Sequence, residues 1–439
     1  MRTTDCVVIG GGPAGMVLGL LLARAGVEVT VVEKHGDFLR DFRGDTVHAS
    51  TLRLLDELGL GPAFEAVPHR LVERFQLLTD SGPVVLADLR RLPGPHKHIA
   101  FVPQWDFLDM LAASASREPT FELRMSTEAV GLVRRGRQVT GVRVREADGR
   151  VREIAARLVV GCDGRDSRLR EQAGLRARSF GVPLDVLWFR LPRRPGDVEG
   201  ATGRFGRGRA MVLIDRGDYF QCAFLIRKGE HDRVLAEGLP AFRGRVSDLL
   251  PWLGDRMDSL TSLEEVRLLS VRLDRLRTWE APGVLFIGDA AHAMSPVGGV
   301  GINLAVQDAV AAARYLAAPL LTGRPRTADL RRVRRRRWLP TAVTQGMQRA
   351  LHAGFLQDAL DSDPRAPSTP PPLLVRALRR FPLLRAVPAY LVAVGLVPEH
   401  APPFARRSPA RRDGAVDRTA TRPVNGRRPG WSVFRFPRR

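Results

Sequence analysis

The first 60 residues alternate between short apolar runs and segments with helical periodicity. A buried strand is predicted over residues 6–9, a helix of small and apolar residues over 16–25, and a second strand over 27–32. An amphipathic helix follows over 50–60, and Gly59 ends it. This order of strand, helix and strand predicts an α/β fold that begins with a Rossmann-like unit.

Strand-like runs dominate the middle of the chain, between residues 181 and 275. The further predicted elements are helices at 107–116 and 302–321 and strands at 127–133, 138–145, 157–161, 186–190, 210–214 and 220–226. We therefore expect a Rossmann-like domain interleaved with a β-sheet domain that covers a ligand. The expected boundaries are 1–75, 101–180 and 276–325 for the first domain, and 76–100 and 181–275 for the second.

The C-terminal part has a different composition. Five prolines gather between residues 364 and 372, which is typical of a linker, and a short helical segment is predicted around 373–396. We expect a helical C-terminal segment over 326–400. Residues 401–439 have little apolar content and are rich in Arg, Pro and Gly, so we expect a poorly ordered basic tail.

Composition limits the class of protein. With 44% hydrophobic and 26% charged residues in 439, the chain can bury a large core. Its three cysteines are far apart in sequence, which argues against a disulfide scaffold and a thiolate zinc site and favours a cytoplasmic protein without a bound metal. The residues before the first strand are few and polar, so no targeting signal is expected there. The apolar stretch at 389–397 is short, so at most peripheral membrane contact is expected.

The net charge of +22 comes almost entirely from arginine, which supplies 66 of the 69 basic residues. Residues 401–439 alone hold 11 Arg against two Asp, and residues 331–337 hold six more Arg. We interpret these runs as a disordered tail and a solvated helix face, with no nucleic-acid partner. Binding to nucleic acid or to an anionic membrane is the alternative.

The first candidate site is the glycine loop at residues 10–15, which reads GGGPAG between a strand and a helix. Gly10 permits a tight turn, Gly12 lets the backbone approach a pyrophosphate, and Gly15 lets the helix pack closely on the strand. Glu33 ends the next strand, where a carboxylate accepts hydrogen bonds from ribose hydroxyls. Together these residues predict a dinucleotide site.

Two further motifs follow buried strands. Asp163 and Gly164 come after the strand at 157–161; alone, this pair is equally consistent with an ordinary turn. Asp289 follows a strand near residue 285, and the glycine-rich segment 296–301 then leads into the long helix. That helix directs its positive end at whatever the loop binds, and such an end favours an anion.

With these three motifs in this order, the chain resembles the FAD-dependent monooxygenases of the aromatic-hydroxylase type, a family that includes p-hydroxybenzoate hydroxylase and the ubiquinone-biosynthesis hydroxylases. The resemblance covers residues 4–325 and extends more loosely to 400. It implies that FAD binds across the motifs and that NAD(P)H acts as a transient reductant. The cofactor-binding residues that the resemblance implies are Gly10, Gly12, Pro13, Ala14, Gly15, Glu33, Lys34, Arg43, Gln104, Val130, Asp163, Gly164, Asp289, Pro296, Gly299, Gly301, Ile302 and Asn303.

The sequence also departs from the family. Residues 295–301 read SPVGGVG, where many hydroxylases have Pro-Pro-x-Gly-Gln-Gly, so the substrate class cannot be copied from phenol hydroxylases. No Trp-x-Trp-x-Ile-Pro segment is present, which argues against a flavin halogenase. There is no second dinucleotide fingerprint, so NAD(P)H is expected to dock without a Rossmann domain of its own.

By resemblance, the activity is hydroxylation or epoxidation of an apolar or aromatic small molecule with O₂, through a flavin C4a-hydroperoxide. A flavin reductase resembling geranylgeranyl reductases is the alternative enzyme. The aromatic residues Trp188, Phe189, Phe220 and Phe224 either line the substrate site or form ordinary core. His292 is interpreted as a structural loop residue, and no catalytic base is assigned; the oligomeric state is left open.

Overall fold

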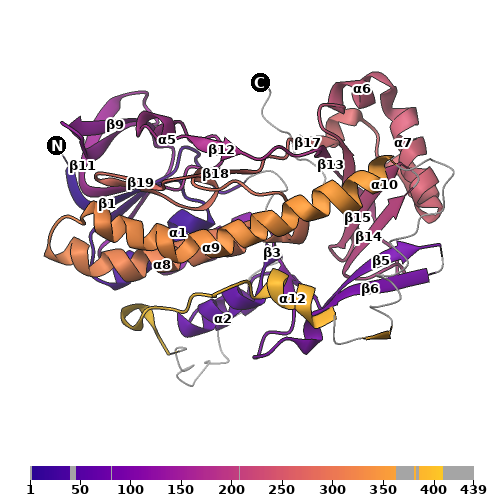
Figure 1. Ribbon diagram of the computed structural model, residues 1–439, viewed down its shortest axis with the longest axis horizontal. Coiled ribbons are helices and arrows are strands. Elements are labelled where there is room, and N and C mark those ends of the chain that lie inside the picture. The colour runs from indigo at the N-terminus through magenta and orange to yellow at the C-terminus, as the bar shows by residue number, and fades with distance from the viewer. Residues whose placement is uncertain are drawn as a thin grey trace, which may run out of the picture.

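The computed structural model describes residues 2–39, 46–80, 82–206, 208–361, 380–381 and 385–408. Two large β-sheets lie side by side, with long helices across one side of the assembly (Figure 1). All three cysteines are free.

The first sheet has a parallel centre, in the strand order β19-β20-β11-β1-β2-β8. Strands β20, β11, β1, β2 and β8 run parallel to their neighbours, whereas β19 is antiparallel to β20, and β9 and β10 form an antiparallel extension on β11. The bounds are β1 (Arg2–Ile9), β2 (Val29–Val32), β8 (Phe121–Arg124), β9 (Glu128–Arg135), β10 (Gln138–Arg145), β11 (Val151–Gly161), β19 (Glu280–Ala281) and β20 (Val284–Phe286).

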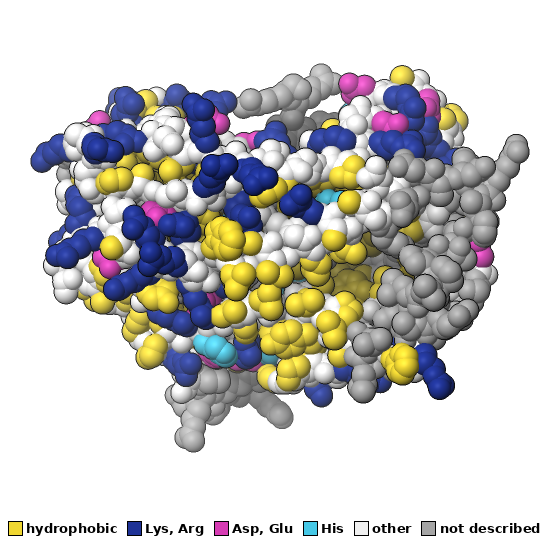
Figure 2. Space-filling view, in the orientation of Figure 1, with side chains coloured by type: hydrophobic (Ala, Val, Ile, Leu, Met, Phe, Trp, Pro, Cys, Tyr) yellow, Lys and Arg dark blue, Asp and Glu magenta, His cyan; other side chains and the backbone are white. Residues whose placement is uncertain are grey.

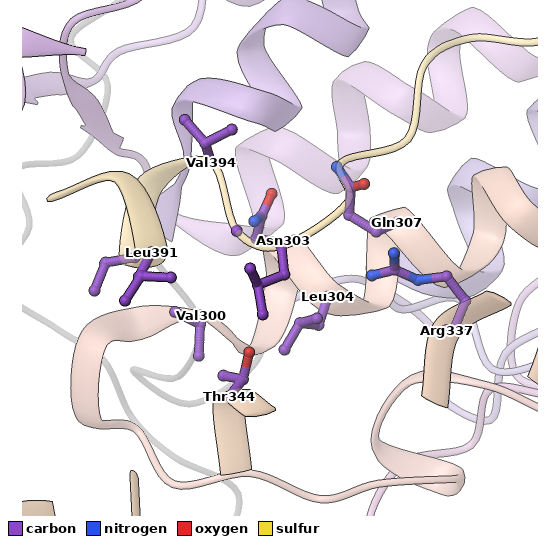
Figure 3. A pocket seen from close by; sticks show the side chains of 11 residues that line it. Val300, Asn303, Leu304, Gln307, Arg337, Thr344, Leu391 and Val394 are labelled. Atoms are coloured by element: carbon purple, nitrogen blue, oxygen red, sulfur yellow. The ribbon is translucent and has the colours of Figure 1, made fainter. Parts of the chain in front are cut away.

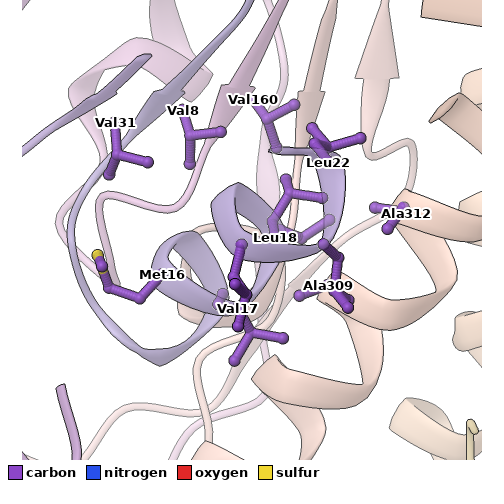
Figure 4. Close-up of a cluster of buried hydrophobic side chains, with 14 of the residues drawn as sticks. Val8, Met16, Val17, Leu18, Leu22, Val31, Val160, Ala309 and Ala312 are labelled. Atoms are coloured by element: carbon purple, nitrogen blue, oxygen red, sulfur yellow. The ribbon is translucent and has the colours of Figure 1, made fainter. Parts of the chain in front are cut away.

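Helices α1 and α8 form the core of this domain with the sheet. Figure 4 shows Leu18 and Leu22 of α1 lying between strand residues such as Val8 and the small residues Ala309 and Ala312 of α8. The helix bounds are α1 (Pro13–Arg24), α2 (Ala49–Glu57), α3 (Gly61–Glu65), α4 (Gln104–Ala115), α5 (Arg168–Gln172), α8 (Gly301–Thr322) and α9 (Thr327–Leu351). Alanines on α8 let it approach α1 closely, because they bury no bulk between the two helix axes.

The segment Val297–Thr322, which contains α8, is long and apolar enough by composition to cross a membrane. However, 72% of its most apolar window is buried inside the fold. A helix that is apolar on all sides is typical of a protein core as well as of a membrane span. Because α8 packs against α1 and α9, it is a core helix of this domain.

The second sheet is mostly antiparallel and has the order β17-β13-β16-β15-β14-β5-β6. Its strands are β5 (Arg74–Thr79), β6 (Gly82–Asp88), β13 (Leu184–Pro192), β14 (Ala201–Gly206), β15 (Arg209–Asp215), β16 (Tyr219–Arg227) and β17 (Arg267–Leu269). Helices α6 (His231–Ala236) and α7 (Gly238–Leu249) follow β16, and α7 packs on one face of the sheet. Helix α10 (Gln357–Asp361) contributes Leu360 to the opposite face.

Two smaller sheets join the larger ones. One is a pair of antiparallel strands, β12 (Ala177–Ser179) and β18 (Asp274–Leu276), through which the chain passes to and from the second sheet. The other contains β3 (Thr46–Val47), β7 (Ile99–Phe101) and β4 (Arg70–Val72). The exact division into two domains remains a prediction.

The arginine run on α9 is not a wholly solvated face, so that prediction is wrong in part. Arg337 is only 1% exposed, and its Nε donates to Asp308 at 3.1 Å. Arg334 Nε donates to the buried Glu280 at 3.0 Å. Helical periodicity explains the difference, since Val333 and Arg337 are four residues apart and share the inner face of α9.

The C-terminal prediction is also corrected in part. Residues 401–408 are ordered: Ala401 and Ala405 are buried, and Arg24 Nη1 donates to the carbonyl of Ala405 at 2.9 Å. Small side chains and this arginine hold the segment against the first domain. Helix α12 (Ala386–Ala393) falls within the predicted helical segment. The predicted linker at 364–372 and the tail at 409–439 lie outside the described residues.

Candidate functional site

The three motifs meet at one edge of the first sheet. Ile9 at the end of β1 is aligned with Gly161 at the end of β11, and Gly161 is aligned with Phe286 at the end of β20. Val32 at the end of β2 pairs with Ile9 on the other side. The loops that carry the motifs therefore leave the sheet at the same level. The carboxyl edge of a parallel sheet is where ligands bind in α/β folds.

Two glycines of the first loop are required by packing, and a third faces open space. A Cβ at Gly10, where φ is +101°, would lie 2.5 Å from the Cys162 carbonyl oxygen, and a Cβ at Gly15 would lie 1.9 Å from the Gly10 oxygen. At Gly12, in contrast, no atom lies within 4 Å of the Cβ position. Gly12 also precedes the first turn of α1, where Pro13 and Ala14 lie. The loop is thus closely packed against the protein at Gly10 and Gly15 and open at Gly12, as a phosphate-binding loop requires.

The Glu33 carboxylate borders this loop. Its Oε2 accepts a hydrogen bond from the Gly11 N–H at 2.8 Å, and its Oε1 accepts one from the His35 N–H at 3.1 Å and contacts His35 Nδ1 at 2.7 Å. Glu33 is 7% exposed, whereas Lys34 beside it is exposed. The carboxylate is therefore fixed next to the glycines by the backbone of both segments.

Asp163 carries a buried oxygen without a partner. Its Oδ1 has no hydrogen-bond partner in the part of the chain that the structure describes. Burial raises the pKa of Asp163 to about 6, although Ser167 and nearby cations oppose the shift. Gly164 follows with φ at +83° and open space around its Cβ position. A buried acceptor beside an open backbone fits a ligand that donates hydrogen bonds.

Arg170 connects the second motif to the third. Its guanidinium donates to the carbonyls of Ala290 at 3.3 Å and Arg165 at 3.2 Å, and it pairs with Asp274 at 3.4 Å. The neighbouring Arg165 lies 3.5 Å from Asp289, whose side chain is one-third exposed. Asp289 therefore faces outward with an accessible carboxylate, while the loops beneath it are fixed.

The glycine-rich segment 296–301 is held by the short strand β3. Gly298 and Gly299 have φ angles of +82° and +63°, which glycine adopts readily. The Thr46 hydroxyl donates to the Gly299 carbonyl at 2.7 Å, and a Cβ at Gly299 would collide with that hydroxyl at 2.7 Å. At Gly301, the first residue of α8, no atom lies within 4 Å of the Cβ position.

The last two residues of the predicted set are buried. Ile302 is 7% exposed, and Asn303 Oδ1 accepts hydrogen bonds from Ser50 at 2.8 Å and Thr51 at 2.7 Å. The side-chain oxygen of Asn303 thus joins α8 to α2. Behind it, a cavity offers about 10 Å³ to the centre of a water molecule, between α8, Arg337 and the 391–396 segment (Figure 3). That volume suits one water rather than a substrate.

The remaining predicted positions are less central. Pro296 precedes the glycines, and Gln104 is the first residue of α4, which packs against α1. Val130 lies on β9, where its carbonyl accepts a hydrogen bond from Gln172 at the end of α5. Arg43 lies outside the described residues.

His292 has the structural surroundings expected of it. It is 1% exposed, its Nε2 lies 2.5 Å from Asp308 Oδ2, and its ring is 4.9 Å from that of Trp279. Asp308 also accepts hydrogen bonds from the Gly288 N–H at 3.1 Å and from Arg337. Burial alone would raise the pKa of Asp308, but His292, Arg337 and this N–H together lower it.

The sequence pattern did not identify Asp308 as the residue that joins His292 to Arg337. The only local signal is a charged residue inside the alanine-rich stretch of α8, where an unpaired carboxylate would be costly. The hydrogen bonds of Asp308 hold Gly288 and His292 in place at the start of the third motif. Among the described residues there is no group of His, Cys, Asp and Glu that could hold a metal ion.

Three of the four candidate substrate-lining aromatics are core residues. Phe189, Phe220 and Phe224 are at most 2% exposed, and they pack edge-on against Phe242 of α7 or against Trp252. Trp188 is on the opposite face of β13, because side chains alternate along a strand. It packs against the same cluster as Val297 of the third loop. Only Trp188 is therefore placed toward the first domain.

These features fit FAD. Open space at Gly12, Gly164 and Gly301 leaves room along three loops, and each loop presents backbone N–H groups or a carboxylate to it. Asp163 Oδ1 is buried and has no partner among the described residues, so it can accept a hydrogen bond from the cofactor. The N-terminus of α8 favours the negative charge of a reduced flavin. An FAD molecule has the length and the polar groups to contact all three loops.

Comparisons with known proteins agree with this geometry. Residues 3–345 match the family described as the FAD binding domain. The chain is 35% identical to 6-methylpretetramide 4-monooxygenase of Streptomyces rimosus over 70% of this chain and 74% of that protein. It is 29% identical to 12-dehydrotetracycline 5-monooxygenase/anhydrotetracycline 6-monooxygenase of Streptomyces rimosus subsp. rimosus, over 82% and 71% of the two chains.

The solved structure of PqsL from Pseudomonas aeruginosa has the same fold. It superimposes with a TM-score of 0.69 at 21% identity, covering 82% of this chain and 97% of that one. The predicted fold class is confirmed, and so is the prediction of a bound FAD. The relatives support an NAD(P)H-using monooxygenase rather than a reductase or a nucleic-acid-binding protein. The chain belongs to the FAD-dependent monooxygenases of the aromatic-hydroxylase family.

Proposed function

We propose that the chain hydroxylates a fused-ring aromatic compound held between the second sheet and the third loop. The observation that carries this proposal is the apolar face of the sheet on which Val297 packs. Trp188, Phe205 and Val212 on this face are only partly buried, whereas the opposite face is closed by α7. An apolar surface formed by these side chains suits a large flat ligand.

When bound, FAD supplies the redox chemistry, taking a hydride from NAD(P)H and transferring one atom of O₂ to the substrate. Glu33 and the loop at Gly12 would hold its ADP part, and Asp163 and Asp289 would accept hydrogen bonds from it. The backbone of 296–301, fixed by Thr46, would support the reacting ring. In this arrangement these residues bind and orient the cofactor.

The sheet face contributes orientation and exclusion of water. Trp188 Nε1 is a buried donor with no hydrogen-bond partner in the described part of the chain. A substrate oxygen, such as a phenol or ring carbonyl, would satisfy that donor and fix the ring relative to Val297. The apolar neighbours keep water from the reacting atoms.

One relative is named for 6-methylpretetramide and another for 12-dehydrotetracycline and anhydrotetracycline, and these names agree with a fused-ring substrate. The test is thermal protection of the FAD-loaded protein by a panel of aromatic ligands. Anhydrotetracycline and other fused-ring phenols should raise the melting temperature more than p-hydroxybenzoate. Equal or better protection by the single-ring acid would contradict the proposed substrate class.

A further inference from the structure

Three arginines surround a single phenylalanine ring at the junction of the two large sheets. The guanidinium carbons of Arg178, Arg275 and Arg349 lie 5.4, 5.3 and 5.1 Å from the centre of the Phe180 ring. Arg275 also lies 5.1 Å from the ring of Trp338, which is 42% exposed. The cluster thus combines β12, β18 and α9. Lys and Arg side chains gather along this part of the surface in Figure 2.

The positive charge of this cluster is uncompensated. None of the three guanidinium groups has a hydrogen-bond or ion-pair partner within the described ranges, and the buried Arg275 Nη1 has no acceptor. The nearest acid along β18, Asp274, is already paired with Arg170. Burial, and then the charges of Arg178 and Arg349, lower the pKa of Arg275. Three like charges held together favour binding of an anion.

Hydrogen bonds of Asp274 and Gln345 connect the cluster to the third motif. The Ala293 N–H donates to Asp274 at 3.3 Å, directly before Arg275 in β18. Gln345, one helical turn from Arg349, donates to the carbonyls of Asp274 and Ala293 at 2.8 and 3.1 Å. Ala293 lies between Asp289 and Pro296 of the third motif. The arginines therefore border the segment that supports the cofactor ring.

We propose that Arg178, Arg275 and Arg349 bind the phosphate groups of the nicotinamide reductant. Guanidinium groups form paired hydrogen bonds with phosphate oxygens, and exposed aromatic rings stack on planar bases. The chain has no second dinucleotide fingerprint, so the reductant needs another anchor. Three arginines also favour NADPH over NADH, because NADPH carries an additional phosphate. This inference rests on the proposed function and locates one of its ligands.

The test is calorimetric titration of the FAD-loaded protein with NADP⁺, which cannot reduce the flavin. Arg178→Gln and Arg275→Gln should each raise the Kd for NADP⁺ about tenfold, with an unchanged flavin spectrum. Arg194→Gln is the matched control, since Arg194 pairs with Asp255 at an exposed site elsewhere. NAD⁺ should bind more weakly than NADP⁺, and inorganic pyrophosphate should compete with NADP⁺.

Wild-type Kd values for NADP⁺ in both variants would overturn the inference and leave the proposed function standing. Where NADP⁺ binds too weakly to measure, an unchanged KM for NADPH in the variants would overturn it equally. Competition by pyrophosphate in the wild type that persists undiminished in Arg275→Gln would place the anion site elsewhere. A flavin that neither NADPH nor NADH reduces would overturn the proposed function together with this inference.

Discussion

At the scale of single residues, the site depends on which glycines are crowded and which face open space. Gly15→Ala places a Cβ 1.9 Å from the Gly10 oxygen, so we expect it to lower the free energy of unfolding by roughly 1–3 kcal/mol. Gly12→Ala meets no atom and keeps an ordinary φ of −73°, so the apoprotein should keep its stability. Its FAD affinity should fall about tenfold or more, roughly 1.4 kcal/mol.

Urea denaturation of the apoproteins and fluorescence titration with FAD separate these two effects. Gly244→Ala on α7 is a suitable control, because its Cβ position is also open and it lies away from the three loops. If Gly12→Ala bound FAD as tightly as the wild type, the loop would not be a phosphate cradle.

Asp163 gives the apoprotein a specific pH dependence. Its folded pKa of about 6 lies above the ordinary value of 3.8, so the folded state binds more protons between these values and loses stability as the pH rises through them. Asp163→Asn removes that loss. The difference in unfolding free energy between the variant and the wild type should shift in favour of the variant from pH 4 to 6 and then level off. A difference that stays constant with pH would show that Asp163 is not desolvated.

Some residue roles could be read from the sequence, and others could not. The glycine loop is a local signal, because a tight turn, a strand and a helix occur within 30 residues. The partnership of Asn303 with Ser50 and Thr51 joins positions about 250 residues apart, and that of Asp308 with His292 and Arg337 depends on two helix faces. Such contacts follow from packing, which the sequence pattern does not specify.

At the scale of elements, the alternation of side chains along β13 separates binding from stability. Trp188→Leu should raise KM for the aromatic substrate about tenfold, because it removes the unpartnered indole N–H from the apolar face. Phe189→Leu changes the opposite face, where α7 packs, and should cost about 1 kcal/mol of stability with KM unchanged.

Steady-state kinetics and thermal unfolding of the same two variants provide the measurement. If Phe189→Leu raised KM and Trp188→Leu did not, the assignment of the two faces would be reversed. The strands themselves were predictable from apolar runs, but the identity of the buried face was not, since both faces of this sheet carry apolar side chains.

At the scale of the whole molecule, residues 401–408 pack against the first domain. Arg407 N–H donates to the Glu57 carbonyl at 3.2 Å, and Ala405 is fully buried. Removal of residues 409–439 should leave stability, FAD content and turnover unchanged, whereas removal of residues 401–439 should lower the melting temperature by several degrees. Melting curves of the two truncations test this difference. Loss of turnover on removing 409–439 alone would give the basic tail a role in catalysis.

The order of the three motifs and the α/β fold could be predicted because each depends on neighbouring residues. The extent of the tail could not, because Ala401 and Ala405 fit the first domain only through a complementary surface more than 340 residues earlier in the chain. The ion pairs of Arg334 and Arg337 on α9 could not be predicted either, because their buried acidic partners lie on β19 and α8.

The central claim is that the chain binds FAD at the three loops and uses it to insert oxygen into an aromatic ring. The most direct measurement supplies the FAD-loaded enzyme with NADPH, isotopically heavy O₂ and a fused-ring phenol, and follows the product by mass spectrometry. We expect a product that gains one heavy oxygen atom per NADPH consumed, and a lower yield of this product from Gly12→Ala when FAD is limiting. Oxidation of NADPH by the loaded enzyme without any heavy oxygen in any fused-ring product, or a protein that binds no FAD, would contradict it.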